Sequence, residues 1–338
     1  MRARFLLLGG LILGALTVAP ATAGAAVLYD QLPSGSFTSK IVPSFDYTNA
    51  AFKDQAADDF TVPDGQVWTI QAVDAFGAAN QGASGTDTGN VFLYQGAGTA
   101  PGNLLFSQSG IALGGGSCSV PNQCDISAPV AGAPNLSPGT YWISLQTAGP
   151  YAWWWLVYPP TGTFGSPAVW QNPGNGSGRN CTTYAPLLQC GWTTASDGKD
   201  FSYRLEGNVI DSHFSLGQPK LKSRYVISQP GTFPGAGTAV VTDAAATGRA
   251  ARLTTGAKKN VKKATVAVGA AGTVNLPIKL THNAKKKLKK HKKVKLRAVI
   301  TFTASGGVPF SLNSTIKLIP AGHRRAVARI AATADPQR

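Results

Sequence analysis

Apolar residues come in short runs along residues 27–211, and Gly, Pro, Asn and Asp separate these runs. No long stretch repeats apolar residues at the 3.6-residue period of a helix. Runs of this length and punctuation predict β-strands. We expect strands at residues 57–62, 66–76, 90–95, 104–113, 140–147, 151–158 and 200–208. Many short strands of this kind predict one large sandwich of jelly-roll type.

Residues 212–320 alternate apolar and polar positions more regularly. Three sets of apolar residues with a period of two predict three strands, each with one buried face. The sets are Val274, Leu276, Ile278 and Leu280; Val294, Leu296, Ala298, Ile300 and Phe302; and Phe310, Leu312, Ile316 and Leu318. Together they predict a second, smaller sandwich of Ig-like type. Pro277 predicts an edge strand, because proline has no N–H for a sheet ladder.

Residues 281–293, between the first two sets, predict a short Lys-rich helix. Thr281 or Asn283 is its expected N-cap, and Ala284 and Leu288 are expected on its buried side. The helix would cross from one sheet of the sandwich to the other. Residues 321–338 carry little core-forming pattern and predict a flexible tail. The chain as a whole is predicted to be all-β, with two β-sandwiches and one short crossing helix.

The first 26 residues have the pattern of an export signal. Arg2 and Arg4 precede an apolar run at residues 5–18, and small residues follow at 21–25. About 14 apolar residues are fewer than the roughly 20 that a membrane-spanning helix needs. We therefore expect cleavage near Ala23 or Ala25 and a secreted protein with no integral membrane anchor.

Charge is split between two parts of the chain, which we call the acidic half (residues 27–211) and the basic half (residues 212–338). The acidic half carries 5 Lys/Arg against 13 Asp/Glu, whereas the basic half carries 24 against 2. The overall net charge of +16 hides this division. Such asymmetry indicates two modules and an anionic partner for one of them.

All four cysteines lie in the acidic half, and an even number in an exported chain predicts disulfides. They are Cys118, Cys124, Cys181 and Cys190. Three pairings are possible, and short local loops favour 118–124 with 181–190. Zinc is the alternative, but C-x5-C and C-x8-C are poor zinc spacings and the acidic half has no histidine. We expect structural disulfides.

Motifs in the acidic half resemble a group of secreted bacterial β-sandwich domains found in cell-surface and sorting-signal-bearing proteins. They lie at residues 57–63, 68–70, 136–145, 170–172 and 200–207. The resemblance implies a β-sandwich exposed at the cell surface, and it implies little about activity. No sorting motif or anchor helix follows in this chain, so it is expected to be retained in another way.

The basic half resembles the Lys-rich Ig-like modules that end many exported proteins of soil actinobacteria. The motifs that carry this likeness lie at residues 214–217, 235–238, 272–278, 285–295 and 302–307. The resemblance implies an accessory surface module that brings no catalytic residues with it.

Residues for catalysis or metal binding are sparse in the acidic half. The four histidines, at His213, His282, His291 and His323, all lie outside it, so a Ser/His or Cys/His site has no base there. Asp58 and Asp59 are neighbours on a predicted strand and point to opposite faces. With Asp197 and Asp200 they are the least implausible calcium ligands, but no ligand loop of fixed spacing is present. We expect no cofactor, no metal and no enzyme.

An aromatic run at residues 151–158 is the best candidate binding site of the acidic half. On a strand, Tyr151, Trp153 and Trp155 share one face and Trp154 shares the other with Tyr158. One interpretation is that one set fills the core and a loop at about 162–178 covers the other. The alternative is an exposed platform that stacks on sugar rings. Its candidate residues are Trp142, Tyr151, Trp153, Trp154, Trp155 and Trp170.

Nine of the thirteen residues from 285 to 297 are Lys or Arg. They are Lys285, Lys286, Lys287, Lys289, Lys290, Lys292, Lys293, Lys295 and Arg297. Such density is typical of a solvated face, yet it also attracts polyanions. Specific nucleic-acid binding is not expected, because no aromatic residues interleave with the lysines and the signal directs the chain out of the cell. Anionic envelope polymers fit this location better.

Together these patterns predict a secreted, non-catalytic protein associated with the cell surface or wall. The basic half would hold it on anionic envelope polymers, and the acidic half would present an aromatic binding surface, for which a glycan is the candidate ligand. Three alternatives remain open. They are a carbohydrate-binding module with a Trp platform, a polysaccharide-active enzyme, and an interaction protein without a small ligand.

Overall fold

The computed structural model describes residues 25–32, 40–79, 88–114, 125–149, 152–158, 164–246, 259–290, 292–319 and 329–335. Strands dominate throughout, and the predicted all-β class is confirmed. Nearly every pair of neighbouring strands is antiparallel; the short pairing of β3 with β10 is parallel. Most of the predicted signal peptide, residues 1–24, lies outside the described residues, as do Cys118, Cys124 and Tyr151.

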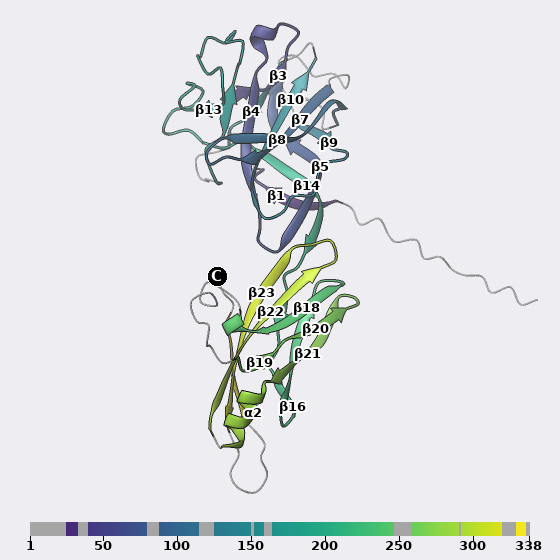
Figure 1. The fold of residues 1–338 in the computed structure, drawn as a ribbon. Helices are drawn as coiled ribbons and strands as arrows, with labels where there is room; N and C mark the ends of the chain where they lie inside the picture. The colour runs from purple at the N-terminus through teal and green to yellow at the C-terminus, as the bar shows by residue number, and fades with distance from the viewer. Residues whose placement is uncertain are drawn as a thin grey trace, which may run out of the picture.

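The acidic half forms three sheets, whose strands Figure 1 shows. The sheets enclose a large core that is rich in aromatic side chains. Their orders are β1-β14-β5-β9, β13-β12-β4-β10-β7-β8 with β3 beside β10, and β2-β11-β6. The strands are β1 (Ala26–Asp30), β2 (Ile41–Pro43), β3 (Phe45–Asp46), β4 (Gln55–Val62), β5 (Gln66–Ala75), β6 (Gly77–Ala79), β7 (Thr88–Gly96), β8 (Pro101–Ala112), β9 (Ile126–Pro129), β10 (Gly139–Ala148), β11 (Trp153–Leu156), β12 (Val169–Gln171), β13 (Ala185–Pro186) and β14 (Tyr203–Asp211). A 3-10 turn, η1 (Ala50–Phe52), precedes β4.

The basic half forms two sheets around a second core, with the orders β15-β17-β21-β19 and β20-β18-β22-β23-β24. β16 also pairs with β17. The elements are β15 (Ser215–Leu216), β16 (Lys220–Ser223), β17 (Val226–Phe233), β18 (Gly237–Asp243), η2 (Ala244–Ala246), β19 (Val261–Lys262), β20 (Ala264–Val268), β21 (Gly272–Leu280), α2 (His282–Lys289), β22 (Val294–Ala304), β23 (Pro309–Ile319) and β24 (Arg329–Asp335).

Helix α2 crosses between the two sheets of the basic half, as predicted. It leaves β21 of one sheet and leads to β22 of the other. Of the two expected N-caps, Thr281 is the one used, because its side chain accepts a hydrogen bond from the Ala284 N–H at 3.3 Å. Ala284 is buried, and Leu288 packs against the core from a half-buried position. No helix in the described part of the chain is long and apolar enough to cross a membrane.

Two details of the basic half differ from expectation or refine it. The edge strand expected from Pro277 is wrong, because β21 lies between β17 and β19. Pro277 pairs with Ser228 of β17, and β19 is short and pairs only with Leu280 and Lys279 on the other side of β21. Residues 321–338 were expected to be a flexible tail, yet Arg329–Asp335 form β24 and pair with β23 along seven residues. That prediction was wrong for this stretch, because an edge strand is held by backbone hydrogen bonds that need no apolar pattern.

The two halves meet where β14 ends. The Ser212 N–H donates to the Gly65 carbonyl at 2.8 Å, and the Ser212 hydroxyl accepts from the Ala304 N–H at 3.0 Å. Gly65 has a φ of 81°, and a Cβ added there would lie 3.0 Å from the Phe310 ring. Figure 1 shows the end of the β22–β23 hairpin beside the acidic half. The β4–β5 turn therefore requires glycine both for its backbone and for close contact with the basic half.

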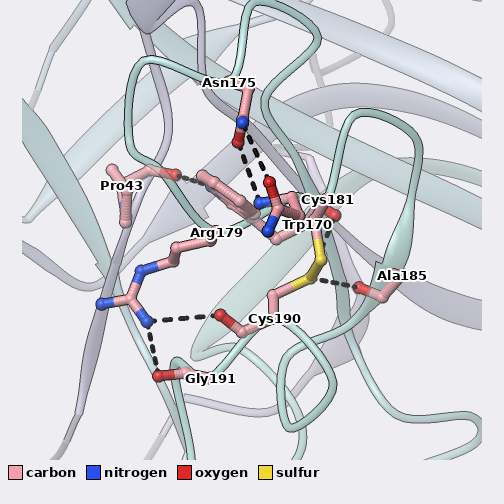
Figure 2. The surroundings of a disulfide bond; sticks show 9 residues. Pro43, Trp170, Asn175, Arg179, Cys181, Ala185, Cys190 and Gly191 are labelled. Atoms are coloured by element: carbon pink, nitrogen blue, oxygen red, sulfur yellow. Dashed lines mark hydrogen bonds between the residues drawn. A yellow bond between two sulfur atoms is a disulfide. The ribbon is translucent and has the colours of Figure 1, made fainter.

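The disulfide between Cys181 and Cys190 is present, with a Cα–Cα distance of 5.8 Å. The Arg179 guanidinium lies nearby and donates to the carbonyls of Cys190 and Gly191, at 3.2 and 2.6 Å (Figure 2). It also lies 3.6 Å from the centroid of the Trp192 ring. The disulfide and Arg179 together fix this long loop against the buried Trp170 side.

Candidate polyanion-binding surface

The predicted lysine run lies on α2, at residues 290, 292 and 293 after it, and at the start of β22, almost entirely in solvent. Eight of its nine residues are exposed: Lys286, Lys287, Lys289, Lys290, Lys292, Lys293, Lys295 and Arg297. Because Ala284 and Leu288 turn one side of α2 to the core, the lysines occupy its solvent side. Lys286, Lys287 and Lys289 lie in the last turn, where a positive charge also interacts favourably with the helix dipole.

Lys285, the ninth residue, is half-buried and packs on an aromatic ring. Its Nζ lies 5.0 Å from the centroid of Tyr225, and the Arg224 guanidinium carbon lies 5.4 Å from the same ring. Tyr225 belongs to the turn between β16 and β17, and its carbonyl accepts from the Leu280 N–H just before α2. Figure 1 places β16 and α2 at the same end of the basic half. Tyr225 thus holds two cations together, through their attraction to its π face.

Strand lysines add to this charge, and two pairs of them lie directly opposite each other. Lys295 pairs with Lys317 across β22 and β23, and Lys262 pairs with Lys279 across β19 and β21. All four side chains are exposed. Like charges directly opposite each other destabilise a sheet, by roughly 0.2–1 kcal/mol for such a pair. The fold therefore carries repulsion that a bound anion would relieve.

Acidic side chains do not neutralise these cations. In the part of the chain that the structure describes, no Lys or Arg of the basic half forms a salt bridge. Asp243 is buried and accepts hydrogen bonds from the backbone N–H groups of Ala245, Asn260 and Val261 instead. The described part of the basic half thus presents a dense positive potential that no ion pair neutralises.

The proposed aromatic platform is wrong for four of its six residues. Trp142, Trp153, Trp155 and Trp170 are each at most 2% exposed. Trp155 stacks on Phe201 at 4.7 Å between ring centroids, and its indole N–H donates to the Ser202 carbonyl at 3.0 Å. The Trp170 indole N–H donates to the Pro43 carbonyl, also at 3.0 Å (Figure 2). Trp154 alone of the described set is half-buried.

Burial on both faces of the central strands explains this error. Residues 142–147 of β10 are all buried, although successive side chains of a strand point to opposite faces. Trp142 packs in a small separate cluster with Ala57 and Val169. Ala57 and Val169 lie on β4 and β12 of the same sheet, and Tyr94 and Tyr184 pack against this cluster, so the face that an exposed platform would need is covered.

The aspartates considered as calcium ligands instead connect loops to β4. Asp58 accepts from the Gln31 side chain at 2.8 Å and from the Phe201 N–H at 2.6 Å. Asp59 accepts from the Ser166 N–H, and Asp200 accepts from the Phe164 N–H, both at 2.9 Å. Asp197 lies apart and is bonded to Thr194. Among the described residues, no three His, Cys, Asp or Glu side chains gather as a metal site would require.

These buried carboxyls have raised pKa values. Burial is the largest cause of the rise for Asp58, whose pKa lies well above its ordinary value, and the charge of Asp200 adds to it. Burial raises the pKa of Asp200 to about 6 and that of Asp54, which the Ser177 hydroxyl contacts, to about 7. The folded acidic half therefore takes up protons at a higher pH than isolated carboxyls do.

No protein-family profile and no curated protein matches the chain. Among solved structures, the propeptide form of a Bacillus licheniformis lipase aligns with 88% of this chain and 45% of its own, at 9% identity and a TM-score of 0.18. A β-glucosidase from Streptomyces venezuelae in complex with D-glucose aligns with 86% of this chain and 50% of its own, at 10% identity and a TM-score of 0.16. The chain thus spans half or less of either protein, and both TM-scores are too low to support any inference about fold or function.

The sequence identified the lysine run but missed cations that only the fold brings to it. They are Lys222, Arg224, Lys262, Lys279 and Lys317. The signal was present in the alternation, since Lys279 and Lys317 each lie between two apolar residues that the core buries. Which cations become neighbours depends on strand order, which alternation does not specify.

Substituting two neighbouring tryptophans distinguishes a buried core position from a position on an exposed platform. Trp155→Ala should lower the free energy of unfolding by about 3–5 kcal/mol, because it removes a buried ring and leaves a cavity. Trp154→Ala, at a half-buried position, should lower it by less than about 1 kcal/mol. Urea denaturation of both variants measures the difference, and equal losses would contradict the burial described for Trp155.

The raised carboxyl pKa values predict a protein that is more stable in mild acid. A carboxyl whose pKa rises from about 3.9 on folding binds its proton more tightly in the folded state. Stability therefore increases as the pH falls from about 7 toward 4, and it is lost as the pH rises through the folded pKa values. The melting temperature at pH 5 should exceed that at pH 7.5 in thermal scans.

Asp54→Asn tests whether a buried carboxyl causes this pH dependence of stability, because asparagine resembles the protonated carboxyl. It should raise the melting temperature at pH 7.5 by roughly 2–4 °C, which corresponds to about 1 kcal/mol, and should change it little at pH 5. Asp64→Asn, at an exposed turn residue, is the matched control. If the melting temperatures of Asp54→Asn at pH 5 and pH 7.5 differ as much as those of the parent, burial of the Asp54 carboxyl does not cause the pH dependence.

The Lys295–Lys317 pair predicts a conflict between stability and anion binding. Lys317→Glu replaces repulsion by attraction and should raise the melting temperature by roughly 1–4 °C at low salt, while weakening binding to polyanions. Lys317→Gln should lie between the parent and Lys317→Glu in both measurements. Thermal scans and heparin elution on the same samples test this, and a lower melting temperature for Lys317→Glu would refute the repulsion.

Proposed function

We propose that this chain is a secreted, non-catalytic surface protein whose basic half binds anionic polymers of the cell envelope. The observation that carries the proposal is positive charge without counterions. Lys286, Lys287 and Lys289 of α2, Arg224 beside Tyr225 and the two facing lysine pairs are exposed. The described cations of the basic half lack salt-bridge partners. A polymer with repeated negative charges would satisfy many of them at once.

Export is supported by two independent features. The first 26 residues have the composition of a secretion signal. The Cys181–Cys190 disulfide is typical of proteins that fold in an oxidising compartment. An exported cationic protein meets the anionic polymers of the cell surface before it meets nucleic acid.

The acidic half contributes a rigid body in this proposal and no sugar-binding platform. Burial of Trp142, Trp153, Trp155 and Trp170 removes the main support for a carbohydrate-binding function. The carboxyls of Asp58, Asp59 and Asp200 accept hydrogen bonds from their own loops, which gives them a structural role. The negative charge of this half would also turn it away from an anionic polymer, leaving it exposed.

Binding of the purified protein to isolated cell walls tests the proposal. Retention should be strong at 50 mM NaCl and should fall steeply toward about 1 M, because the screening length shrinks from about 14 Å to about 3 Å. Chemical removal of phosphate-containing wall polymers should abolish it. A protein that remains in solution at low salt would refute the function.

A pair of matched variants locates the binding surface. Lys286→Gln/Lys289→Gln, on the exposed side of α2, should weaken retention by about threefold, since each contacting cation contributes to the salt-dependent term. Lys40→Gln/Lys199→Gln removes two exposed charges from the acidic half and should leave retention unchanged. Equal losses in the two variants would mean that net charge alone, without the basic surface, governs binding.

A further inference from the structure

A groove of about 520 Å³ lies on the basic half, at the sheet formed by β16, β17 and β21. Its lining includes Lys222, Ser223, Val226, Ser228, Asn275 and Lys279. The volume falls within the range of ligand sites in proteins. The hollow lies outside the lysine run and combines cations, hydroxyl and amide groups, and an apolar floor.

Strand register explains how the groove is built. Val226 of β17 pairs with Lys279 of β21 on one side and with Ser223 of β16 on the other. The two flanking strands thus lie about 10 Å apart, twice the spacing of neighbouring strands. Ile227 and Ile278 point into the core, so the alternate residues Val226, Ser228 and Pro277 form an outer floor. Lys222 and Lys279 lie on opposite walls.

The floor is matched to a hydroxylated carbon chain. Val226 and Pro277 offer apolar surface, and the Ser228 hydroxyl donates to the Asn275 side-chain oxygen at 3.0 Å. The same Ser228 hydroxyl oxygen retains lone pairs that can accept a hydrogen bond from a ligand hydroxyl. Ser223 is exposed at the wall. Contacts to carbon and to hydroxyl groups therefore alternate along a short path.

The walls are matched to phosphate. Lys279 faces Lys262 directly, and both ammonium groups are exposed without a salt-bridge partner among the described residues. Lys222, on the opposite wall, is also exposed. An anion between them would relieve the repulsion and form charge-assisted hydrogen bonds. Two cationic walls about 10 Å apart favour a ligand with repeated charges over a single small anion.

We propose that the groove binds one chain of a phosphodiester-linked polyol, with phosphates at Lys222 and Lys279 and the polyol over Val226, Ser228 and Pro277. This rests on the proposed polyanion-binding function and names the subsite and ligand class. None of the groove's lining residues is aromatic, so nucleic-acid bases would have no stacking partner there. A carboxylate polymer without hydroxyl groups would leave the polar part of the floor unmatched.

Fluorescence anisotropy with a labelled glycerol-phosphate oligomer of about ten units tests the proposal. The full-length exported protein should bind it more tightly than single-stranded DNA or polyglutamate with the same number of charges, at one fixed salt concentration. Lys222→Gln/Lys279→Gln should weaken binding by tenfold or more. Lys286→Gln/Lys289→Gln removes the same charge outside the groove and should weaken it by threefold or less.

Ser228→Tyr separates shape from charge, because it fills the groove without altering any charge. It should weaken oligomer binding at least fivefold and leave retention on heparin unchanged. All variants change residues outside the core, and thermal scans confirm that each is folded. Three results would each refute the proposed groove site while leaving polyanion binding intact. They are equal weakening by the two lysine double variants, full oligomer binding by Ser228→Tyr, and tighter binding of DNA than of the oligomer. Failure of the parent to bind any polyanion would overturn the proposed function itself.

Discussion

Positive charge without salt-bridge partners among the described residues is the constraint that shapes the basic half. Its core contains apolar residues and the hydrogen-bonded pair Gln229 and Ser314, so the described lysines lie outside it. Alternation along β21, β22 and β23 achieves this, but it also sets Lys295 against Lys317 and Lys262 against Lys279. The arrangement lowers stability and favours anion binding, and the ligand proposed for this surface follows from that imbalance.

The acidic half differs from the basic half because it buries several carboxyl groups, which hold loops against its sheets. Large aromatic rings fill its core, and the carboxyls of Asp58, Asp59 and Asp200 lie among them. Each carboxyl accepts hydrogen bonds from backbone or amide groups of loops that would otherwise leave the sheets. Buried groups of this kind are costly unless they are satisfied, which explains why burial dominates their pKa values. They hold loops in place at the expense of stability at neutral pH.

The contact between the halves keeps the acidic half away from the most cationic end of the basic half. Ser212 bonds to Gly65 of one half and to Ala304 of the other, and Phe310 packs against the β4–β5 turn. The groove and α2 lie on the basic half near β16, whereas this contact involves the other end of the β22–β23 hairpin (Figure 1). An anionic polymer bound at α2 and the groove would therefore leave the acidic half free of it.

The sequence by itself determined the long strands such as β5, β10 and β22, the all-β class, the crossing helix with Thr281 as one of two possible caps, and the concentration of charge. These follow from local periodicity, because a strand or helix buries whichever face is apolar. Tertiary structure alone decided the rest. Trp142 is buried in a cluster with Ala57 and Val169, against which Tyr94 and Tyr184 pack. Arg329–Asp335 form a strand because β23 has a free edge, and the groove exists because β16 pairs with β17. Periodicity shows which residues share a face, but whether another layer covers that face depends on segments far away in the chain.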